Sequence, residues 1–190
     1  MTRGRPMRAD ARRNYERLLK VAAEAFAEHG ENASLDDIAR RAGVGSGTLY
    51  RHFPTRRALL EAAYVDRIDA LGARAGELAK ELPPGEALME WLYELAVGTL
   101  QVRGMKALLS SAVTDDSGAP ALTECGSVVK GAAARLVAAA QAEGTLRGDV
   151  ESIEVLRLAH GVAMATELGH GGPKEIRRYL RLLAEGLRLG

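Results

Sequence analysis

The side chains best suited to binding chemistry lie close together between residues 46 and 56. Hydroxyl, imidazole and guanidinium groups occur at Thr48, Tyr50, Arg51 and His52, and Arg56 follows. Such groups hydrogen-bond to phosphate oxygens and to the edges of bases in the major groove of DNA. The residue types and their spacing therefore indicate a contact with DNA.

Two short helices joined at a glycine would position these groups. Ser34 is a typical N-cap for the first helix, and Gly43 ends that helix where a left-handed residue is commonly needed. In the second helix Leu49 and Phe53 lie four residues apart and point inward together. The pattern is that of a helix-turn-helix, although any two short helices joined at a glycine share it. The remaining side chains face outward or lie at the edges: Ser46, Gly47, Thr48, Tyr50, Arg51 and His52.

The segment GTLYRHFPTRRALLEAAY, which starts at Gly47, resembles the signature of the tetracycline-repressor (TetR) family of bacterial transcription regulators. That signature has a first helix ending in Phe and Gly, the motif G-T-x-Y-x-x-F, and a Lys or Arg opening the fourth helix. The resemblance implies a ligand-responsive DNA-binding regulator, expected to be a repressor that a small molecule releases from its operator. Over residues 12–64 the chain carries each part: Phe26, Gly30, Gly47, Thr48, Tyr50, Phe53 and Arg56.

The resemblance also implies roles for single residues. Many relatives carry Lys, Arg or Gln where this chain has Ser46, so direct base readout is expected to be sparse. Sequence preference then rests on Arg51, on Arg41 or on DNA shape. A two-fold dimer implies a palindromic operator in double-stranded DNA, with half-sites roughly 34–36 Å or a small multiple of that apart. The positions carried over are phosphate contacts at Thr48, Tyr50, His52 and Arg56, and groove-facing positions at Ser46, Gly47 and Arg51.

The composition of the 190 residues favours an all-α protein. Aromatic residues make up only 4%, and runs of β-branched residues are almost absent. The apolar spacing predicts about nine helices. They divide into a helix-turn-helix DNA-binding domain over residues 1–58 and a helical ligand-binding and dimerisation domain over residues 59–190. The first helix is expected from Ala11 to His29, after a flexible basic arm over residues 1–10 that either contacts DNA or is solvated.

The charge is unevenly placed along the chain. Residues 1–60 hold 12 Lys and Arg against 7 Asp and Glu, whereas the remaining 130 hold 14 against 18. A basic end on an otherwise acidic protein is expected to bind a polyanion there. The sequence has neither a secretory signal nor an apolar stretch long enough to span a membrane, so we expect a cytoplasmic protein.

Cys125 is the only cysteine, which excludes an intrachain disulfide. Paired with His160 or His170 it would form a thiol–imidazole nucleophile, but no nucleophile motif surrounds it, so an enzyme is not expected. A thiol-based redox-sensing regulator is an alternative function, as is a ligand-binding scavenger without a DNA function. The four histidines are too scattered for a metal site, and no cofactor is expected.

The last two helices, expected over residues 152–168 and 173–189, each have two apolar faces. In the final helix Ile176, Leu180, Leu183 and Leu187 follow the 4-3-4 spacing of packed helices. Two consecutive helices of this kind need more partners than one small body supplies. We therefore expect a homodimer through a symmetric four-helix interface, and the resemblance implies the same.

Apolar side chains in the C-terminal part have two explanations. Residue by residue, a plain core explains them better than a pocket does. The resemblance, however, implies a pocket for a small, largely apolar effector, oriented by His160 or Trp91. The residues expected to contact it are Trp91, Leu95, Met105, Leu108, Leu109, Val129, His160 and Met164.

Overall fold

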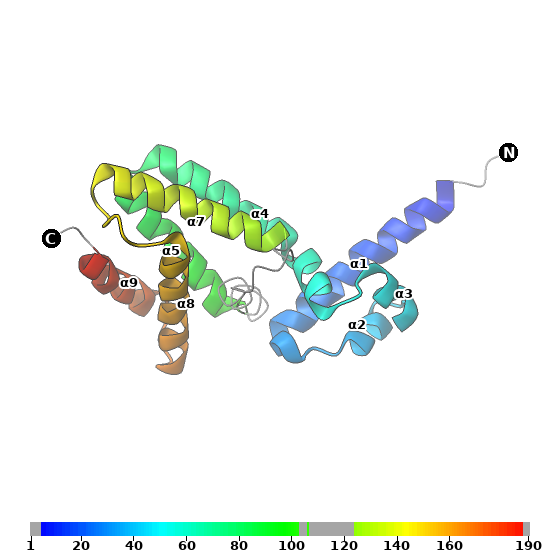
Figure 1. The fold of residues 1–190 in the computed structure, drawn as a ribbon. Helices are drawn as coiled ribbons and strands as arrows, with labels where there is room; N and C mark the ends of the chain where they lie inside the picture. The colour runs from blue at the N-terminus through cyan, green and yellow to red at the C-terminus, as the bar shows by residue number, and fades with distance from the viewer. Residues whose placement is uncertain (1–4, 103–105, 107–123, 188–190) are drawn as a thin grey trace. The chain divides into compact units, whose positions relative to one another are not determined.

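A computed structural model describes residues 5–102, 106 and 124–187 of the chain (Figure 1). Across these ranges the chain forms eight α-helices and one short 3-10 helix, with no strand. The predicted all-α class is therefore confirmed. The chain divides into two compact units, Met1–Val65 and Asp66–Gly190, called here the N-terminal unit and the C-terminal unit.

The N-terminal unit contains three complete helices, a 3-10 turn and the start of a fourth helix. α1 spans Arg5–His29, η1 Gly30–Asn32, α2 Leu35–Arg41 and α3 Ser46–His52, and α4 begins at Arg56. The predicted flexible arm is wrong for residues 5–10, because α1 already includes them. Proline is tolerated in a first helical turn, so Pro6 fits near the helix start, and the alanines and arginines after it are good helix formers.

Local capping chemistry sets the two turns of this unit. Ser34 is the N-cap of α2, and its hydroxyl accepts the Asp37 N–H at 3.3 Å, as predicted. Gly43 has a φ of +67°, the left-handed conformation expected for a glycine after a helix. Below these turns lies a core of fully buried side chains from four helices: Phe26, Ile38, Leu49 and Leu59.

The C-terminal unit is built around α5. α4 (Arg56–Glu81) is followed by α5 (Pro84–Gln101), α7 (Glu124–Glu143), α8 (Ser152–Leu168) and α9 (Pro173–Leu187). α5 packs against α7, α8 and α9, and α8 packs against both of its neighbours (Figure 1). The bounds of α8 are those predicted. Residues 103–105 and 107–123, between α5 and α7, lie outside the described residues.

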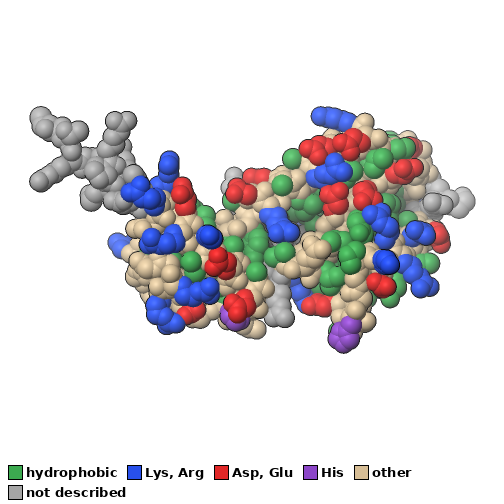
Figure 2. All heavy atoms as spheres, turned by 180° about the vertical axis from the view of Figure 1, so that it is seen from behind, with side chains coloured by type: hydrophobic (Ala, Val, Ile, Leu, Met, Phe, Trp, Pro, Cys, Tyr) green, Lys and Arg blue, Asp and Glu red, His purple; other side chains and the backbone are tan. Residues whose placement is uncertain are grey.

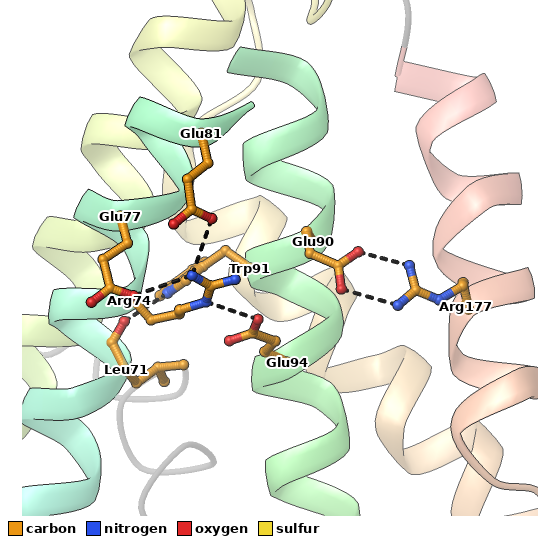
Figure 3. A network of polar contacts seen from close by, with 8 residues as sticks. All are labelled: Leu71, Arg74, Glu77, Glu81, Glu90, Trp91, Glu94 and Arg177. Carbon is orange, nitrogen blue, oxygen red and sulfur yellow. Dashed lines mark hydrogen bonds and ion pairs between the residues drawn. The ribbon is translucent and has the colours of Figure 1, made fainter. Parts of the chain in front are cut away.

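Polar contacts fasten α5 to the helices on either side of it (Figure 3). Arg74 of α4 pairs with Glu94 of α5 at 3.1 Å, and the Trp91 indole N–H donates to the Leu71 carbonyl at 3.0 Å. On the other side of α5, two hydrogen bonds of 2.7 and 3.0 Å join Arg177 of α9 to Glu90. Hydrogen bonding to that guanidinium lowers the pKa of the Glu90 carboxyl.

Candidate nucleic-acid interface

α3 separates an inner apolar side from an outer polar side, as predicted. Leu49 is fully buried, and Phe53 directly after the helix is 5% exposed. The Tyr50 side chain, by contrast, is 46% exposed. The outer side of α3 therefore presents polar side chains and one tyrosine ring to solvent. The other exposed residues of the helix are Ser46, Gly47, Arg51 and His52, and Thr48 is half-buried.

Arg51 lies back along its own helix. Its Nε donates to the Gly47 carbonyl at 3.1 Å, and its Nη2 donates to the Thr48 hydroxyl at 3.1 Å. Both bonds are exposed, so each contributes little net stability in water. A base edge or a phosphate can replace these acceptors at small cost once the guanidinium swings outward.

An aromatic cluster supports the C-terminal end of α3. The ring of Tyr15 from α1 stacks on Phe53 with centroids 5.7 Å apart, and it meets His52 edge-on at 6.1 Å. Tyr15 fixes the end of the helix that carries His52, but it was not among the predicted site residues. It lies three residues before Leu18, so it extends the apolar stripe of α1 by one turn, a signal available from the spacing.

Arg56 has a structural role at the start of α4. Its Nη1 donates to the Ala33 carbonyl in the turn before α2, and the side chain is half-buried. Thr55 caps the same helix end, because its hydroxyl accepts the Ala58 N–H at 3.1 Å. Next to it Arg57 pairs with Glu61 at 3.0 Å. The first turn of α4 is therefore a braced element beside α2 rather than a free basic arm.

Two arginines connect α1 and α2, the helices beside α3. Arg17 of α1 donates from Nε to the Ala42 carbonyl at 2.7 Å, which satisfies a carbonyl at the end of α2. Arg41 of α2 lies 3.6 Å from the Glu24 carboxylate of α1. Figure 2 shows further Lys and Arg side chains spread over the surface of the N-terminal unit, with acidic groups between them. This surface carries the excess of positive charge found in the sequence.

The described members of the predicted effector set lie partly in the core and partly on α8. Trp91, Leu95 and Val129 are buried core residues, and the Trp91 N–H already donates to Leu71. His160 and Met164 are half-buried and lie one turn apart on α8. Burial of the His160 imidazole, and to a smaller extent the nearby charge of Lys106, lowers the pKa of His160. The remaining three predicted contacts lie outside the described residues: Met105, Leu108 and Leu109.

A cavity of about 480 Å³ does occur in the C-terminal unit, at another place. It lies between the first turns of α5, the last turn of α7 with the turn after it, the start of α8 and the end of α9. None of the predicted contacts lines it. The only signal for it in the sequence is a pair of glycine-containing turns. The lining residues are Pro83, Gly85, Glu86, Leu88, Met89, Leu92, Ala140, Glu143, Gly144, Thr145, Leu146, Val155, Leu183 and Ala184.

Cysteine and histidine side chains are the remaining candidates for reactive or metal-binding groups. The side chain of Cys125 lies outside what the structure describes, so its redox role stays a prediction; His170 is exposed at the end of α8. Among the described residues no group of His, Cys, Asp and Glu side chains is arranged to hold a metal ion. In the same part of the chain, no helix combines the length and the apolar character needed to cross a membrane.

Two family models match separate parts of the chain. Residues 18–63 match the model described as bacterial regulatory proteins, tetR family. Residues 83–189 match the model described as transcriptional regulator SbtR-like, C-terminal domain. The first match contains the helix-turn-helix, and the second contains α5, α7, α8 and α9.

Solved structures and curated proteins agree with these matches. The TetR transcriptional regulator SCO0520 from Streptomyces coelicolor is 36% identical, with a TM-score of 0.56, over 91% of this chain and 97% of its own. A TetR regulatory protein from Mycobacterium vanbaalenii is 34% identical, with a TM-score of 0.51, over 97% and 100%. The HTH-type transcriptional regulator SAUSA300_2515 of Staphylococcus aureus strain USA300 is 50% identical over 48 residues, which are 25% of this chain and 26% of that protein. The chain thus matches only about a quarter of the length of this curated relative.

Proposed function

Because the chain belongs to the TetR family of bacterial transcriptional regulators, we propose that it binds a palindromic operator in double-stranded DNA as a homodimer and represses transcription. A small, largely apolar molecule bound in the C-terminal unit would then release it. The observation that carries the proposal is the outer side of α3, where Tyr50 and Arg51 are exposed above a buried Leu49. The family is one of regulators rather than enzymes.

The residues proposed to meet DNA fall into two groups. Arg51 is the strongest candidate for a base contact, because a guanidinium can bind two acceptors of a guanine at once. Tyr50 is proposed to hold a phosphate or to pack its ring on a thymine methyl group. Arg56 is proposed to act near a phosphate while its bond to Ala33 orients it. The full set is Ser46, Gly47, Thr48, Tyr50, Arg51, His52 and Arg56.

The proposed homodimer interface consists of α8 and α9. These helices pack on each other, and each leaves large apolar side chains in solvent. Leu168 of α8 is 84% exposed and Leu182 of α9 is 56% exposed, while Leu158 and Tyr179 are exposed to about 40%. Exposed large apolar side chains on neighbouring helices are common at protein–protein interfaces. Pairing two copies through both helices would bury it in a four-helix arrangement.

The proposed release by a ligand requires two conformations of unequal ligand affinity. An effector that bound the DNA-competent and the released conformations equally well would shift nothing. Ligand responsiveness is typical of the family, and the cavity in the C-terminal unit offers the necessary volume. The cavity, rather than the predicted residues around Trp91, is the place where we propose that the effector binds.

The experiment that tests the DNA function is fluorescence anisotropy with duplexes from upstream of the protein's own gene. The wild-type protein should bind one inverted repeat more tightly than random duplex, and its affinity should fall steeply with salt. Tyr50→Ala and Arg51→Ala should each weaken operator binding about tenfold or more. Size-exclusion chromatography should show an unchanged dimer in both variants.

Arg135→Ala is the matched control, because Arg135 is an exposed arginine of α7, outside both the N-terminal unit and the proposed dimer interface. It should leave operator affinity unchanged. Arg56→Ala is less informative than Arg51→Ala, since it also removes the bond to Ala33. Failure to bind any inverted repeat more tightly than random duplex would refute the proposed function.

A further inference from the structure

The cavity in the C-terminal unit has an apolar floor. Leu88 and Leu92 of α5 and Val155 of α8 line it, and each is at most 3% exposed. Met89 and Leu183 are half-buried and line the same space. A floor of aliphatic side chains in a volume of about 480 Å³ suits an alkyl or other hydrocarbon group of a small molecule.

A close backbone approach forms one wall of this cavity. A Cβ atom added at Gly85, in the first turn of α5, would lie 2.7 Å from Oγ1 of Thr145, in the turn after α7. Only a glycine therefore fits at this point without moving Thr145. Gly144, the preceding residue, has a φ of +81°, which lets the chain turn away from α7 here.

Glu143 is held in place at this wall. Its Oε2 accepts the Gly85 N–H at 3.1 Å. The Thr145 hydroxyl lies 3.1 Å from the same oxygen and 3.1 Å from the Ala140 carbonyl, so its single proton serves one acceptor at a time. A carboxylate fixed by its neighbours is ready to receive a donor without first being ordered.

The charged side chains that line the cavity are both acidic. They are Glu86 and Glu143, and the lining residues described by the structure include no Lys, Arg or His. Glu86 also lines an adjoining groove together with Glu90, Arg177 and Arg181, so charges of both signs lie near it. Glu143 lines the cavity without lining that groove. A carboxylate ligand would be repelled by Glu143, whereas an ammonium group would pair with it.

We propose that this cavity binds a lipophilic amine. The hydrocarbon part lies against Leu88, Leu92 and Val155, and the ammonium group donates to the carboxylate of Glu143. The role of this amine as the effector rests on the proposed function, but its binding does not.

Isothermal titration calorimetry on the full-length protein with octylamine, octanol and octanoate tests the proposal. The three probes share a chain length and differ in head-group charge, and octylamine is cationic at neutral pH. Octylamine should bind most tightly, at least tenfold more tightly than octanoate. Glu143 is itself exposed, so Glu143→Gln should weaken octylamine binding about two- to fivefold. Octanol binding should be unchanged, because glutamine keeps an acceptor for the Gly85 N–H. Glu185→Gln, on an exposed position of α9 that does not line the cavity, should bind all three like the wild type.

A second variant tests the location. Ala184→Leu places a larger side chain on the cavity lining and should abolish binding of octylamine and octanol, while Ala138→Leu, exposed on α7, should not. Circular dichroism checks that both variants are folded. The proposal would be overturned if octanoate bound as tightly as octylamine. It would also be overturned if Ala184→Leu bound octylamine as the wild type does.

Operator binding separates this proposal from the proposed function. Octylamine that binds in calorimetry and releases the operator supports both the site and its effector role. Octylamine that binds without affecting the operator supports the site and overturns its effector role. A protein that binds octylamine but no inverted repeat contradicts the DNA function alone.

Discussion

Gly72 is the position where α4 comes very close to α7. A Cβ atom added there would lie 2.6 Å from Cγ1 of Val128, far inside the ~3.5–4.0 Å at which carbon atoms attract. Val128 is β-branched, so its methyl groups cannot turn away freely. We therefore expect Gly72→Ala to push α4 and α7 apart at this point.

Two opposing terms set the size of the effect. Alanine is better than glycine in a helix interior by about 1 kcal/mol. Overpacking a close contact costs about 1–3 kcal/mol. Gly76, one turn further along α4, has open space around an added Cβ atom, so Gly76→Ala carries only the first term. Gly76→Ala should therefore be stabilised by about 1 kcal/mol, and Gly72→Ala should be less stable than Gly76→Ala by about 1–3 kcal/mol.

Urea unfolding followed by circular dichroism at one protomer concentration measures both variants. Equal protomer concentration is needed because association changes apparent stability. Trp91, buried on α5, gives an independent fluorescence signal from the C-terminal unit. If both variants gained the same stability, the close approach of α4 to α7 at Gly72 would be refuted.

Three other changes have defined outcomes. Ser34→Ala should lower the free energy of unfolding by about 1 kcal/mol, because it removes the side-chain cap of α2; urea unfolding measures it. Glu90→Gln should lose up to about 1 kcal/mol at neutral pH. Since hydrogen bonding to Arg177 lowers the pKa of Glu90, the wild type should lose stability below about pH 4.3 and the variant should lose less. Burial of the imidazole, and to a smaller extent the positive charge of Lys106, lowers the pKa of His160. The melting temperature of the wild type should therefore fall as the pH drops below about 6.5, and that of His160→Gln should fall less.

A specific result would refute each of these three predictions. An unchanged unfolding midpoint in Ser34→Ala would show that the cap does not stabilise α2. Parallel acid profiles of the wild type and Glu90→Gln would remove the ion pair as a source of pH dependence. For His160 the control is His170→Asn, since His170 is exposed and its φ of 51° is one that asparagine tolerates. This control should keep the pH dependence of the wild type.

Local structure could be predicted from the sequence where it depends on residues that are close together along the chain. The cap at Ser34, the turn at Gly43 and the inward position of Leu49 all follow from residues within a few positions, and the structure has each of them. The start of α1 shows the limit of the same reasoning. Gly4 and Pro6 indicate a flexible arm, yet a proline fits in the first turn of a helix as well as in an arm.

The predicted effector residues stay a prediction, because helical spacing does not distinguish a core from a pocket. A buried tryptophan in a core and one in a pocket have the same neighbours in sequence, and Trp91 differs only in its bond to Leu71 on another helix. The cavity depends on the approach of Gly85 to Thr145, residues that are far apart along the chain. Helical spacing predicts which face of a helix is buried, but it does not predict how two helix ends meet.

A ligand in the cavity has a defined physical route to α4. α4 contains the junction of the two units at Val65 and Asp66, so it links them covalently. The cavity-lining α5 holds α4 through Trp91 and through the Arg74–Glu94 pair. Weakening operator binding a hundredfold requires a difference of about 2.8 kcal/mol in effector binding between the two conformations. An effector that binds the released conformation more tightly by this amount, and that moves α5 together with its contacts to α4, can account for release without unfolding either unit.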